Sequence, residues 1–332
     1  MPPQHRPIQR PPTGKVLLGL LAIVYVVYLV VFGRYVYAWM TGITGVSETI
    51  SVHEVDTNPT VVVSYWTKGT MSSAIDGDQL IDNTGNSVDF TQASSDISAG
   101  KAARQDGQPP LNGNSAYPLS TVGKVFFTNA SGQNMVCSGT AVVSLNHNVV
   151  DTAGHCLYWN GNWVHNMIFC PLYDKGSSPY GCWAARDLEV PSEWIGARQG
   201  DLHRDFGMAI VSPNSQGNLT DVVGGAGLAY NQPVNQTFYA YGYPAAYPFD
   251  GQTRQFCPGS SGKGWQMGGG TVISVPCNMT GGSSGGPWFI KINGNLYVNG
   301  HNDFTSSIQR GHMFSPYYDD AWFALYDKAQ HT

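Results

Sequence analysis

Residues 281–299 read GGSSGGPWFIKINGNLYVN, and this stretch carries the strongest local structural signals of the chain. Its second half contains two apolar runs separated by the dipeptide Asn293-Gly294. Both residues of that dipeptide tolerate the positive φ of a type I′ turn, so the pattern predicts a β-hairpin. Pro287 and the hairpin follow directly on the glycine-rich loop around two serines, which favours a strand over a helix after that loop.

Short apolar runs of the same kind recur from residue 122 onward, between clusters of Gly, Asn and Pro. The runs are Val122–Phe127, Gly139–Val143, Val149–Asp151, Met208–Val211, Thr237–Tyr243, Thr271–Val275, Trp288–Ile292 and Leu296–Asn299. Such spacing is typical of an all-β barrel or sandwich. Residues 320–330 differ, because Trp322, Phe323 and Tyr326 can share one face of a helix, so we expect one C-terminal helix.

The composition of the 332 residues agrees with a turn-rich β protein. Charged residues make up 12% and aromatic residues 12%, and there are 40 Gly and 20 Pro. Few charges and many turn formers disfavour helix bundles and coiled coils, while the aromatic content excludes a disordered chain. With a net charge of -5 and only 17 Lys and Arg, no basic stripe is available for phosphates, so we expect no nucleic-acid partner.

The first forty residues predict export from the cytoplasm. Three basic residues within 1–15 precede an uncharged apolar run that starts at Val16. The segment 16–40 is long enough for a transmembrane signal-anchor, with 1–15 as a cytoplasmic tail. A signal peptide cleaved after the triplet 36–38 is the alternative. Either interpretation places the remaining chain outside the cytoplasm, membrane-anchored or secreted.

Residues 41–116 are rich in Ser, Gly, Asp, Asn and Thr, with one apolar patch at Thr60–Trp66. Most of this segment lacks the periodicity that burying a core requires. We therefore expect a polar stalk or pro-segment with a single strand at the apolar patch. The main domain is expected to cover 117–332.

All six cysteines lie in the C-terminal two thirds of the chain, and none forms the C-x-x-C pair that suggests zinc. An oxidising compartment is the simpler interpretation. Consecutive pairing would close three loops, each contributing roughly 3 kcal/mol in the chain-entropy model. Among the pairings that six cysteines allow, we favour Cys137–Cys156, Cys170–Cys182 and Cys257–Cys277.

Two distant segments carry the side chains that could do chemistry. TAGHC at 152–156 follows an apolar run, which places His155 at a strand end, where the favoured disulfide would fix the backbone as a general base requires. The loop 281–287 surrounds Ser284 with glycines, so the amides of Gly282 and Ser284 can converge on one point. Together they predict a nucleophile, a base and an oxyanion hole.

A third member should be a buried carboxylate that orients the histidine and stabilises its protonated form. Asp205 leads directly into an apolar run and suits this role. Asp187, Asp201 and Asp221 remain alternatives, although none has an apolar run immediately behind it.

Five motifs, in this order along the chain, resemble the chymotrypsin-like (trypsin-like) serine endopeptidases, and within them the bacterial secreted branch that includes the glutamyl, V8-like endopeptidases. The motifs are CSGT (137–140), TAGHC (152–156), DFGMAIV (205–211), GYP (242–244) and GGSSGGP (281–287). The resemblance covers about residues 117 to 325. It implies a double β-barrel that hydrolyses peptide bonds through an acyl-enzyme, with His155, Asp205 and Ser284 as the triad and Gly282 and Ser284 in the oxyanion hole. It implies a peptide or protein substrate and no metal or organic cofactor.

The chain departs from the family pattern at several positions. Asp151 stands where an apolar residue is usual, so its carboxylate must be satisfied locally or point outward. Ser283 replaces the Asp that pairs with the freed N-terminus of animal enzymes, so activation by that ion pair is not available. Asn278 replaces the Asp of trypsins, which argues against selection of Lys or Arg. By position, His301 with Thr280 would line a pocket that prefers Glu or Asp.

Two other functions were weighed against this one. Gly282-x-Ser284-x-Gly286 also matches the nucleophile elbow of α/β-hydrolases such as esterases and lipases, with Asp303 and His312 as the later acid and base. An elbow needs a helix after the serine, whereas a strand is predicted here. An inactive, surface-anchored binding module with a protease fold is the alternative from a different class.

Overall fold

The computed structural model describes residues 48–77, 91–92, 104–105, 116–196, 201–261, 264–267, 269–307 and 309–332. The predicted cytoplasmic tail and membrane-spanning or signal segment, 1–15 and 16–40, lie outside these ranges, as does most of the second half of the predicted stalk. Within the described ranges, no helix is long and apolar enough to cross a membrane.

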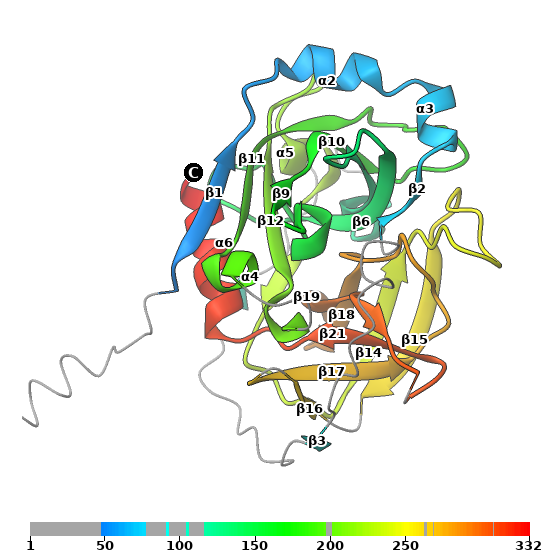
Figure 1. Ribbon diagram of the computed structural model, residues 1–332. Helices are drawn as coiled ribbons and strands as arrows, with labels where there is room; N and C mark the ends of the chain where they lie inside the picture. The colour runs from blue at the N-terminus through cyan, green and yellow to red at the C-terminus, as the bar shows by residue number, and fades with distance from the viewer. Residues whose placement is uncertain are drawn as a thin grey trace, which may run out of the picture. The chain divides into compact units, whose positions relative to one another are not determined.

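The first half of the protein is a closed antiparallel barrel of six strands (Figure 1). Its strands are β5 (Val122–Thr128), β6 (Asn134–Val142), β7 (Val149–Ala153), β10 (His165–Pro171), β11 (Trp183–Pro191) and β12 (Phe206–Val211). They follow one another as β11-β10-β5-β6-β7-β12, and the pairing of β12 with β11 closes the ring. Closure leaves no strand of this set with an unpaired side along its whole length.

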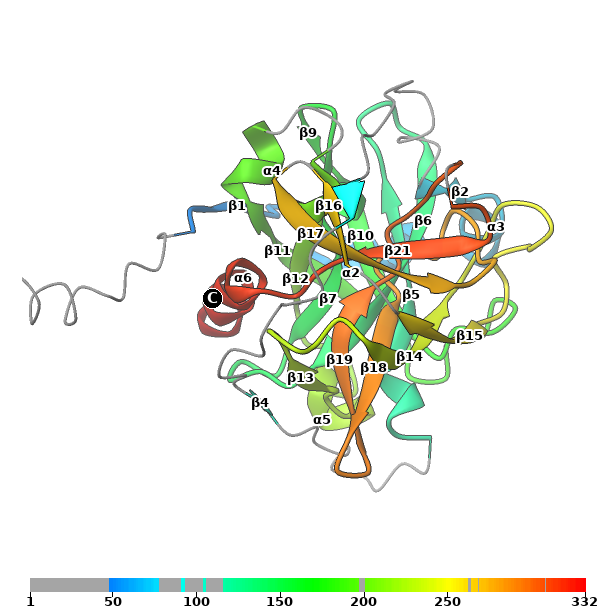
Figure 2. The same cartoon turned by 90° about the horizontal axis from the view of Figure 1, so that it is seen from below.

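The second half consists of two sheets. One contains β15 (Gln255–Ser261), β14 (Gln236–Gly242), β18 (Pro287–Ile292), β19 (Asn295–His301), β13 (Gly227–Ala229) and β4 (Arg104–Gln105). The other contains β20 (Phe304–Thr305), β21 (His312–Pro316), β17 (Gly270–Pro276), β16 (Gly264–Met267) and β3 (Thr91–Gln92). Figure 2 shows the strands of the two sheets running in different directions.

The predicted double barrel is therefore closed by backbone pairing only in its first half, as far as the described residues show. In the second half, side chains connect the two sheets. The disulfide Cys257–Cys277 joins β15 to the residue after β17, and the His301 amide on β19 donates to Ser315 Oγ on β21 at 2.9 Å.

The disulfide pairing in the structure is the one that the spacing favoured: Cys137–Cys156, Cys170–Cys182 and Cys257–Cys277. The predicted hairpin is also present, since β18 and β19 pair around Asn293 and Gly294, whose φ angles are 51° and 89°. A strand thus follows the serine loop, as the sequence indicated, and an α/β-hydrolase elbow is not favoured.

The segment before the barrel does not form the strand that was predicted at Thr60–Trp66. That patch lies in α2 (Pro59–Tyr65), which is followed by α3 (Lys68–Ser72). The Asn58 side chain accepts from the Thr60 amide at 2.9 Å, and Pro59 occupies the first helical turn. This capping outweighs the strand preference of the valines, of which only Val62 is buried.

Two short strands attach this segment to the first barrel. β1 (Ile50–Glu54) pairs antiparallel with β11, and β2 (Ile75–Asp76) pairs parallel with β6. Part of the predicted stalk is therefore packed on the domain. The remaining short elements are η2 (Leu119–Thr121), η3 (Gly154–Cys156), β8 (Tyr158–Trp159), β9 (Asn162–Trp163), α4 (Ser192–Gly196), η4 (Leu202–Arg204) and α5 (Leu219–Val223).

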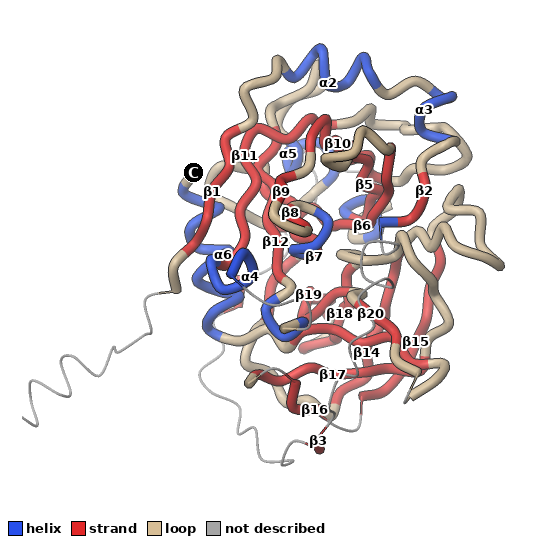
Figure 3. The backbone as a smooth tube through the Cα atoms, in the orientation of Figure 1, coloured by secondary structure: helices blue, strands red, loops and turns tan. Residues whose placement is uncertain are grey.

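The predicted C-terminal helix is α6 (Asp320–His331), and Figure 3 shows it beside β1 and β11. Asp319 caps it by accepting from the amides of Ala321 and Trp322. Trp322 and Tyr326 are buried, and the Tyr326 hydroxyl donates to Val143 O at 2.7 Å. The helix thereby fastens the C-terminus to the first barrel.

Candidate active site

The ladder between β7 and β12 brings two of the predicted site residues together. Phe206 at the start of β12 pairs with Ala153 at the end of β7, so the residues just beyond this pair meet. Asp205 Oδ2 lies 2.8 Å from His155 Nδ1, and Asp205 Oδ1 accepts the His155 amide at 2.7 Å. One carboxylate therefore holds both the ring and the backbone of the histidine.

Gly154 makes this close approach possible. A Cβ added there would lie 2.8 Å from Phe206 O, closer than real side chains come, and 3.0 Å from Asp205 Oδ1, which is a tight contact. The glycine of the TAGHC motif is thus required by the meeting of the two strand ends.

The charge of Asp205 is set by opposing effects. Complete burial would by itself raise its pKa, but the charge of His155 and the hydrogen bonds from His155 and Asp303 outweigh burial, so the pKa lies below its ordinary value. Asp205 is therefore ionised at neutral pH and accepts hydrogen from Nδ1. This leaves Nε2 as the acceptor nitrogen of a neutral imidazole.

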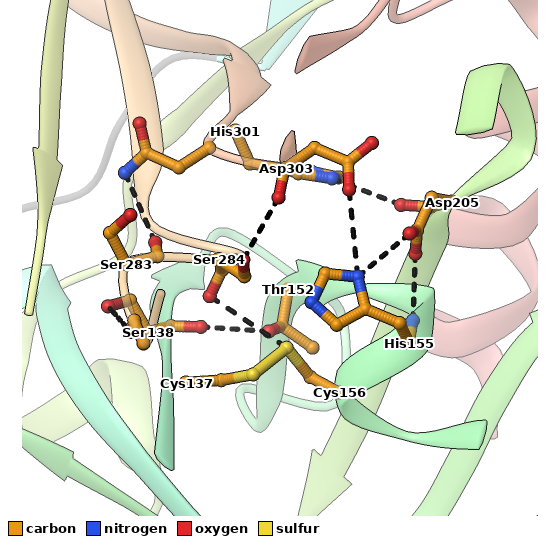
Figure 4. Close-up of a disulfide and its surroundings, with 12 residues drawn as sticks. Cys137, Ser138, Thr152, His155, Cys156, Asp205, Ser283, Ser284, His301 and Asp303 are labelled. Carbon is orange, nitrogen blue, oxygen red and sulfur yellow. Dashed lines mark hydrogen bonds and ion pairs between the residues drawn. A yellow bond between two sulfur atoms is a disulfide. The ribbon is translucent and has the colours of Figure 1, made fainter. Parts of the chain in front are cut away.

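Ser284 lies in the loop between β17 and β18. Its backbone oxygen accepts the Ser138 amide at 2.7 Å, and its Oγ donates to Asp303 O at 3.1 Å. In Figure 4 the imidazole of His155 lies between Asp205 and Ser284, and the ring nitrogen that is not bound to Asp205 points toward Ser284. The three residues singled out from the sequence thus gather at one place, where Ser284 is only 1% exposed.

The loop before Ser284 is held by a side chain of the first barrel. Ser138 Oγ donates to Gly282 O at 3.0 Å and accepts the Tyr243 amide at 2.8 Å. Gly282 has a φ of 90°, and a Cβ there would lie 2.9 Å from Ala245 Cβ. No hydrogen bond among the described residues uses the Gly282 amide, so it is available to an incoming oxygen. The sequence motif containing Ser138 was noticed, but this clamping role was missed.

The segment before the barrel also reaches this loop. Asp76 on β2 is almost fully buried, and a Cβ added to Gly281 would lie 2.6 Å from Asp76 Oδ1. Gly281 in turn accepts the Ala245 amide at 2.6 Å. The loop is thus packed from both sides, and no residue before 117 was expected at the site.

A second carboxylate lies at the site. Asp303 Oδ1 is 3.6 Å from His155 Nδ1, and both side chains are buried. The sequence had offered Asp303 only as the acid of an α/β-hydrolase, together with His312. His312, the first residue of β21, instead contacts Gln309, with its Nδ1 3.3 Å from the amide nitrogen of that residue.

Two groups in the described part of the chain have potential metal ligands close together. One combines His155 with Cys137 and Cys156, whose sulfurs are consumed by their disulfide. The other combines His155, Asp205 and Asp303, whose ligand atoms lie within 4.8 Å of one another. In that group Nδ1 of the histidine is already engaged with Asp205.

His301 does not lie where the predicted substrate pocket needs it. It is fully buried, with Nδ1 2.9 Å from the Tyr318 hydroxyl and Nε2 3.1 Å from Asp205 O. Burial lowers its pKa to about 4. Both nitrogens are thus engaged behind the triad, and the expected role at a substrate carboxylate is corrected. A sequence position after a hairpin does not reveal which side of the sheet a side chain takes.

The other predicted pocket residues lie nearer the surface. Thr280 is half-buried and donates to Ala246 O at 2.7 Å, and Asn278 is exposed. Among the alternative carboxylates, Asp187 binds Arg186 at 2.6 Å and Asp221 binds His147 at 2.7 Å. Asp205, and neither of these two, contacts His155.

Solved structures agree with this architecture. The chain is 38% identical to a thermostable serine protease AL20 from an extremophilic microorganism, with 64% of this chain and 98% of that chain covered and a TM-score of 0.58. It is 34% identical to the protease Anisep from Arthrobacter nicotinovorans, with 68% and 100% covered and a TM-score of 0.58. No protein-family model matches the sequence, and no curated protein is significantly similar to it.

A closed six-stranded barrel, a second β half and a C-terminal helix define a chymotrypsin-like fold. With the identities above, the chain belongs to the serine protease family. These neighbours do not distinguish the V8-like branch within it.

Proposed function

We propose that the protein is a serine endopeptidase that hydrolyses peptide bonds through an acyl-enzyme. The observation that carries this proposal is the position of the His155 imidazole, bound to Asp205 through Nδ1 with its other nitrogen directed at Ser284. This geometry suits a base that receives the hydroxyl proton of the serine.

The proposed reaction uses the chain's own groups. Ser284 Oγ attacks the peptide carbonyl carbon while its proton passes to His155 Nε2, and Asp205 stabilises the imidazolium that forms. The amides of Gly282 and Ser284 donate to the tetrahedral oxyanion, a contribution of roughly 3 kcal/mol per donor. His155 then returns the proton to the leaving amine, and a water molecule hydrolyses the acyl-enzyme by the same route.

A fluorophosphonate probe tests the nucleophile, with a neighbouring serine as control. We expect the wild-type protein and Ser283→Ala to be labelled and Ser284→Ala to remain unlabelled. Ser283 is a suitable control because it lies in the same loop, and its buried hydroxyl makes no hydrogen bond within the described residues. A folded wild-type protein that takes no label would instead favour the binding module.

We place this activity outside the cytoplasm, because three disulfides are typical of proteins in oxidising compartments. A retained anchor or a cleaved signal at 16–40 would both deliver the chain there. N-terminal sequencing of the mature protein distinguishes them, since only cleavage removes residues 1–38.

The proposed substrates are peptides or proteins, and a V8-like preference for acidic residues would need a group other than His301. Asn278 carries no charge to select Lys or Arg. We therefore expect kcat/KM for peptides with Glu, Phe or Lys before the cleaved bond to depend on the shape of the pocket more than on the charge of that residue. Comparing kcat/KM on the three peptides checks this, and a strong preference for Glu would restore the acidic specificity.

A further inference from the structure

Asp151, the residue that departs from the family pattern before the TAGHC motif, is completely buried in the first barrel. Its Oδ2 lies 2.6 Å from the Tyr318 hydroxyl, and its Oδ1 accepts from Trp322 Nε1 at 3.1 Å. The carboxylate is thus satisfied locally, by residues at and just before the C-terminal helix. No cation faces it to offset its burial among these contacts.

The hydrogen bonds continue from Tyr318 to the triad. The Tyr318 hydroxyl lies 2.9 Å from His301 Nδ1, and His301 Nε2 lies 3.1 Å from the backbone oxygen of Asp205. Asp151, Tyr318, His301 and Asp205 are each 0% exposed. An unbroken buried chain of hydrogen bonds therefore connects Asp151 to the residue that orients His155.

The number of protons in this chain follows from the donors and acceptors. The Asp205 carbonyl can only accept, so His301 Nε2 carries a hydrogen and donates it. In a neutral imidazole Nδ1 is then an acceptor, which requires the single hydroxyl hydrogen of Tyr318. The Tyr318 oxygen must in turn accept from Asp151, so Asp151 must be protonated.

The alternative arrangement contains the same number of protons. If Asp151 is ionised, the Tyr318 hydrogen goes to it, and His301 must carry a second hydrogen as a cation. In both arrangements, all the hydrogen bonds form only if one extra proton is present, carried either by Asp151 or by His301. An ionised Asp151 together with a neutral His301 lacks this proton. Removing that proton leaves one of the hydrogen bonds unmade in a dry interior, which is costly.

Burial decides where the shared proton resides. It raises the pKa of Asp151 to about 7, partly offset by hydrogen bonds from Tyr318 and Trp322. It lowers the pKa of His301 to about 4, where the charge of Asp205 acts upward and that of His155 downward. Both directions favour a protonated Asp151 and a neutral His301. The other carboxyl group that acts on Tyr318 is that of Asp303.

We propose that Asp151 and Tyr318 are positioning residues of the triad, which act through His301 and a shared proton to hold the backbone of Asp205 in place. This inference rests on the proposed function, because positioning is observed through turnover. The proton count itself is independent of turnover, because it also governs the stability of the fold.

The sign of the pH dependence follows from the position of this proton. The pKa of Asp151 is raised from 3.8 in an exposed chain to about 7 in the fold. Its contribution to stability is therefore fully present below about pH 4 and is lost as the pH rises through about 7. Above that pH the hydrogen-bonded series from Asp151 to Asp205 lacks its shared proton. Asp205 is then held less firmly, so turnover should fall.

The test compares kcat over pH 5 to 10 for the wild type and two variants. In Asp151→Asn the amide nitrogen donates to Tyr318 at every pH, so we expect near wild-type kcat at pH 6 and no alkaline loss from this group. In Tyr318→Phe the connection is cut, and we expect kcat about tenfold lower at pH 6, since small displacements of catalytic groups have effects of this order. Tyr326→Phe is the control, because the buried Tyr326 hydroxyl donates to Val143 O and takes no part in the hydrogen bonds that connect Asp151 to Asp205.

Parallel pH profiles for wild type and Asp151→Asn would overturn the proposal, as would an unchanged kcat in Tyr318→Phe. Denaturant unfolding at the same pH values tests the shared proton without turnover, so it distinguishes an incorrect positioning proposal from an incorrect proposed function. We expect the wild-type midpoint to fall between pH 5 and 8 relative to that of Asp151→Asn, even in a protein without turnover. Superimposable midpoint curves would reject the shared proton. If Asp151→Asn does not fold, Tyr318→Phe supplies the comparison, because it removes a hydrogen bond that lowers the pKa of Asp151 and should extend the fall of the midpoint to higher pH.

Discussion

The first barrel closes through backbone ladders, with β12 returning to β11, whereas the second half is two sheets connected by side chains. In the first barrel, strand register alone brings His155 to Asp205. In the second half, the loop of Ser284 depends on individual bonds, such as the one from Ser138 Oγ to Gly282 O. A ladder thus positions residues at its own strand ends, while the loop between the two sheets is held by separate backbone and side-chain hydrogen bonds.

The largest effect on kcat is expected at Asp205, the carboxylate that the ladder between β7 and β12 places beside His155. Asp205→Asn should lower kcat by about 10⁴-fold, because an amide cannot hold the imidazole in its working tautomer. The control is Asp221→Asn, which alters another Asp–His pair, with His147, away from Ser284. Steady-state kinetics with thermal unfolding as a folding check measures both. A loss below tenfold in Asp205→Asn would show that register does not supply the orienting group.

Removing the disulfide between the two sheets should have the next largest effect. The double variant Cys257→Ala with Cys277→Ala should lose about 3 kcal/mol of unfolding free energy and part of kcat, because no ladder joins β15 to β17 within the described residues. The matched pair Cys170→Ala with Cys182→Ala should lose stability but keep kcat, since β10 and β11 pair beside it. Equal losses of kcat in both double variants would remove the distinction between the halves.

The clamp on the serine loop is expected to contribute less. Ser138→Ala leaves the buried Tyr243 amide without its acceptor, which should cost about 2 kcal/mol and lower kcat about tenfold. Ser144→Ala is the control, because the Ser144 hydroxyl makes no hydrogen bond within the described part of the chain. Denaturant unfolding and kcat give the two numbers, and matching values for the two variants would contradict a clamp.

The smallest effect should come from the seam between β19 and β21. Gly300→Ala would place a Cβ 2.8 Å from Ser315 Oγ, the atom that accepts the His301 amide. Gly294 in the hairpin turn also has a positive φ, 89° against 147° at Gly300, but a Cβ there would meet open space. We therefore expect Gly300→Ala to be less stable than Gly294→Ala by about 1 kcal/mol, measured by thermal unfolding. Equal stabilities would mean that this seam tolerates rearrangement.

Much of the framework was accessible from the sequence because it is encoded locally. The apolar runs from residue 122 onward, the Asn293-Gly294 turn and the amphipathic C-terminal helix can each be recognised from a few neighbouring residues. The structure contains the corresponding strands, turn and helix. Cysteine spacing gave the disulfide pairing as well. The gathering of His155, Asp205 and Ser284 was foreseen from motifs rather than from periodicity.

What the sequence did not yield depends on long-range contacts. Asp303 and Ser138 belong to the site because of contacts with residues that are not their sequence neighbours. Asp303 O accepts from Ser284 Oγ, and Ser138 Oγ donates to Gly282 O. His301 was expected to line a substrate pocket with Thr280, but it lies against Tyr318 and Asp205, because position in the sequence does not say which face of a strand a side chain takes. Asp151 was recognised as unusual, but its partners lie at and before the C-terminal helix and could not be inferred from local pattern.

The attachment of β1 and β2 to the first barrel bears on where the chain can be shortened. A chain beginning at Tyr117, the boundary suggested by composition, would lose the strand that covers Asp187–Pro191 on β11 and the carboxylate that rests on Gly281. The uncovered strand would be open to pairing with a second molecule, which invites aggregation. A truncated version that retains everything from Glu48 onward keeps both contacts and is the safer starting point for purification.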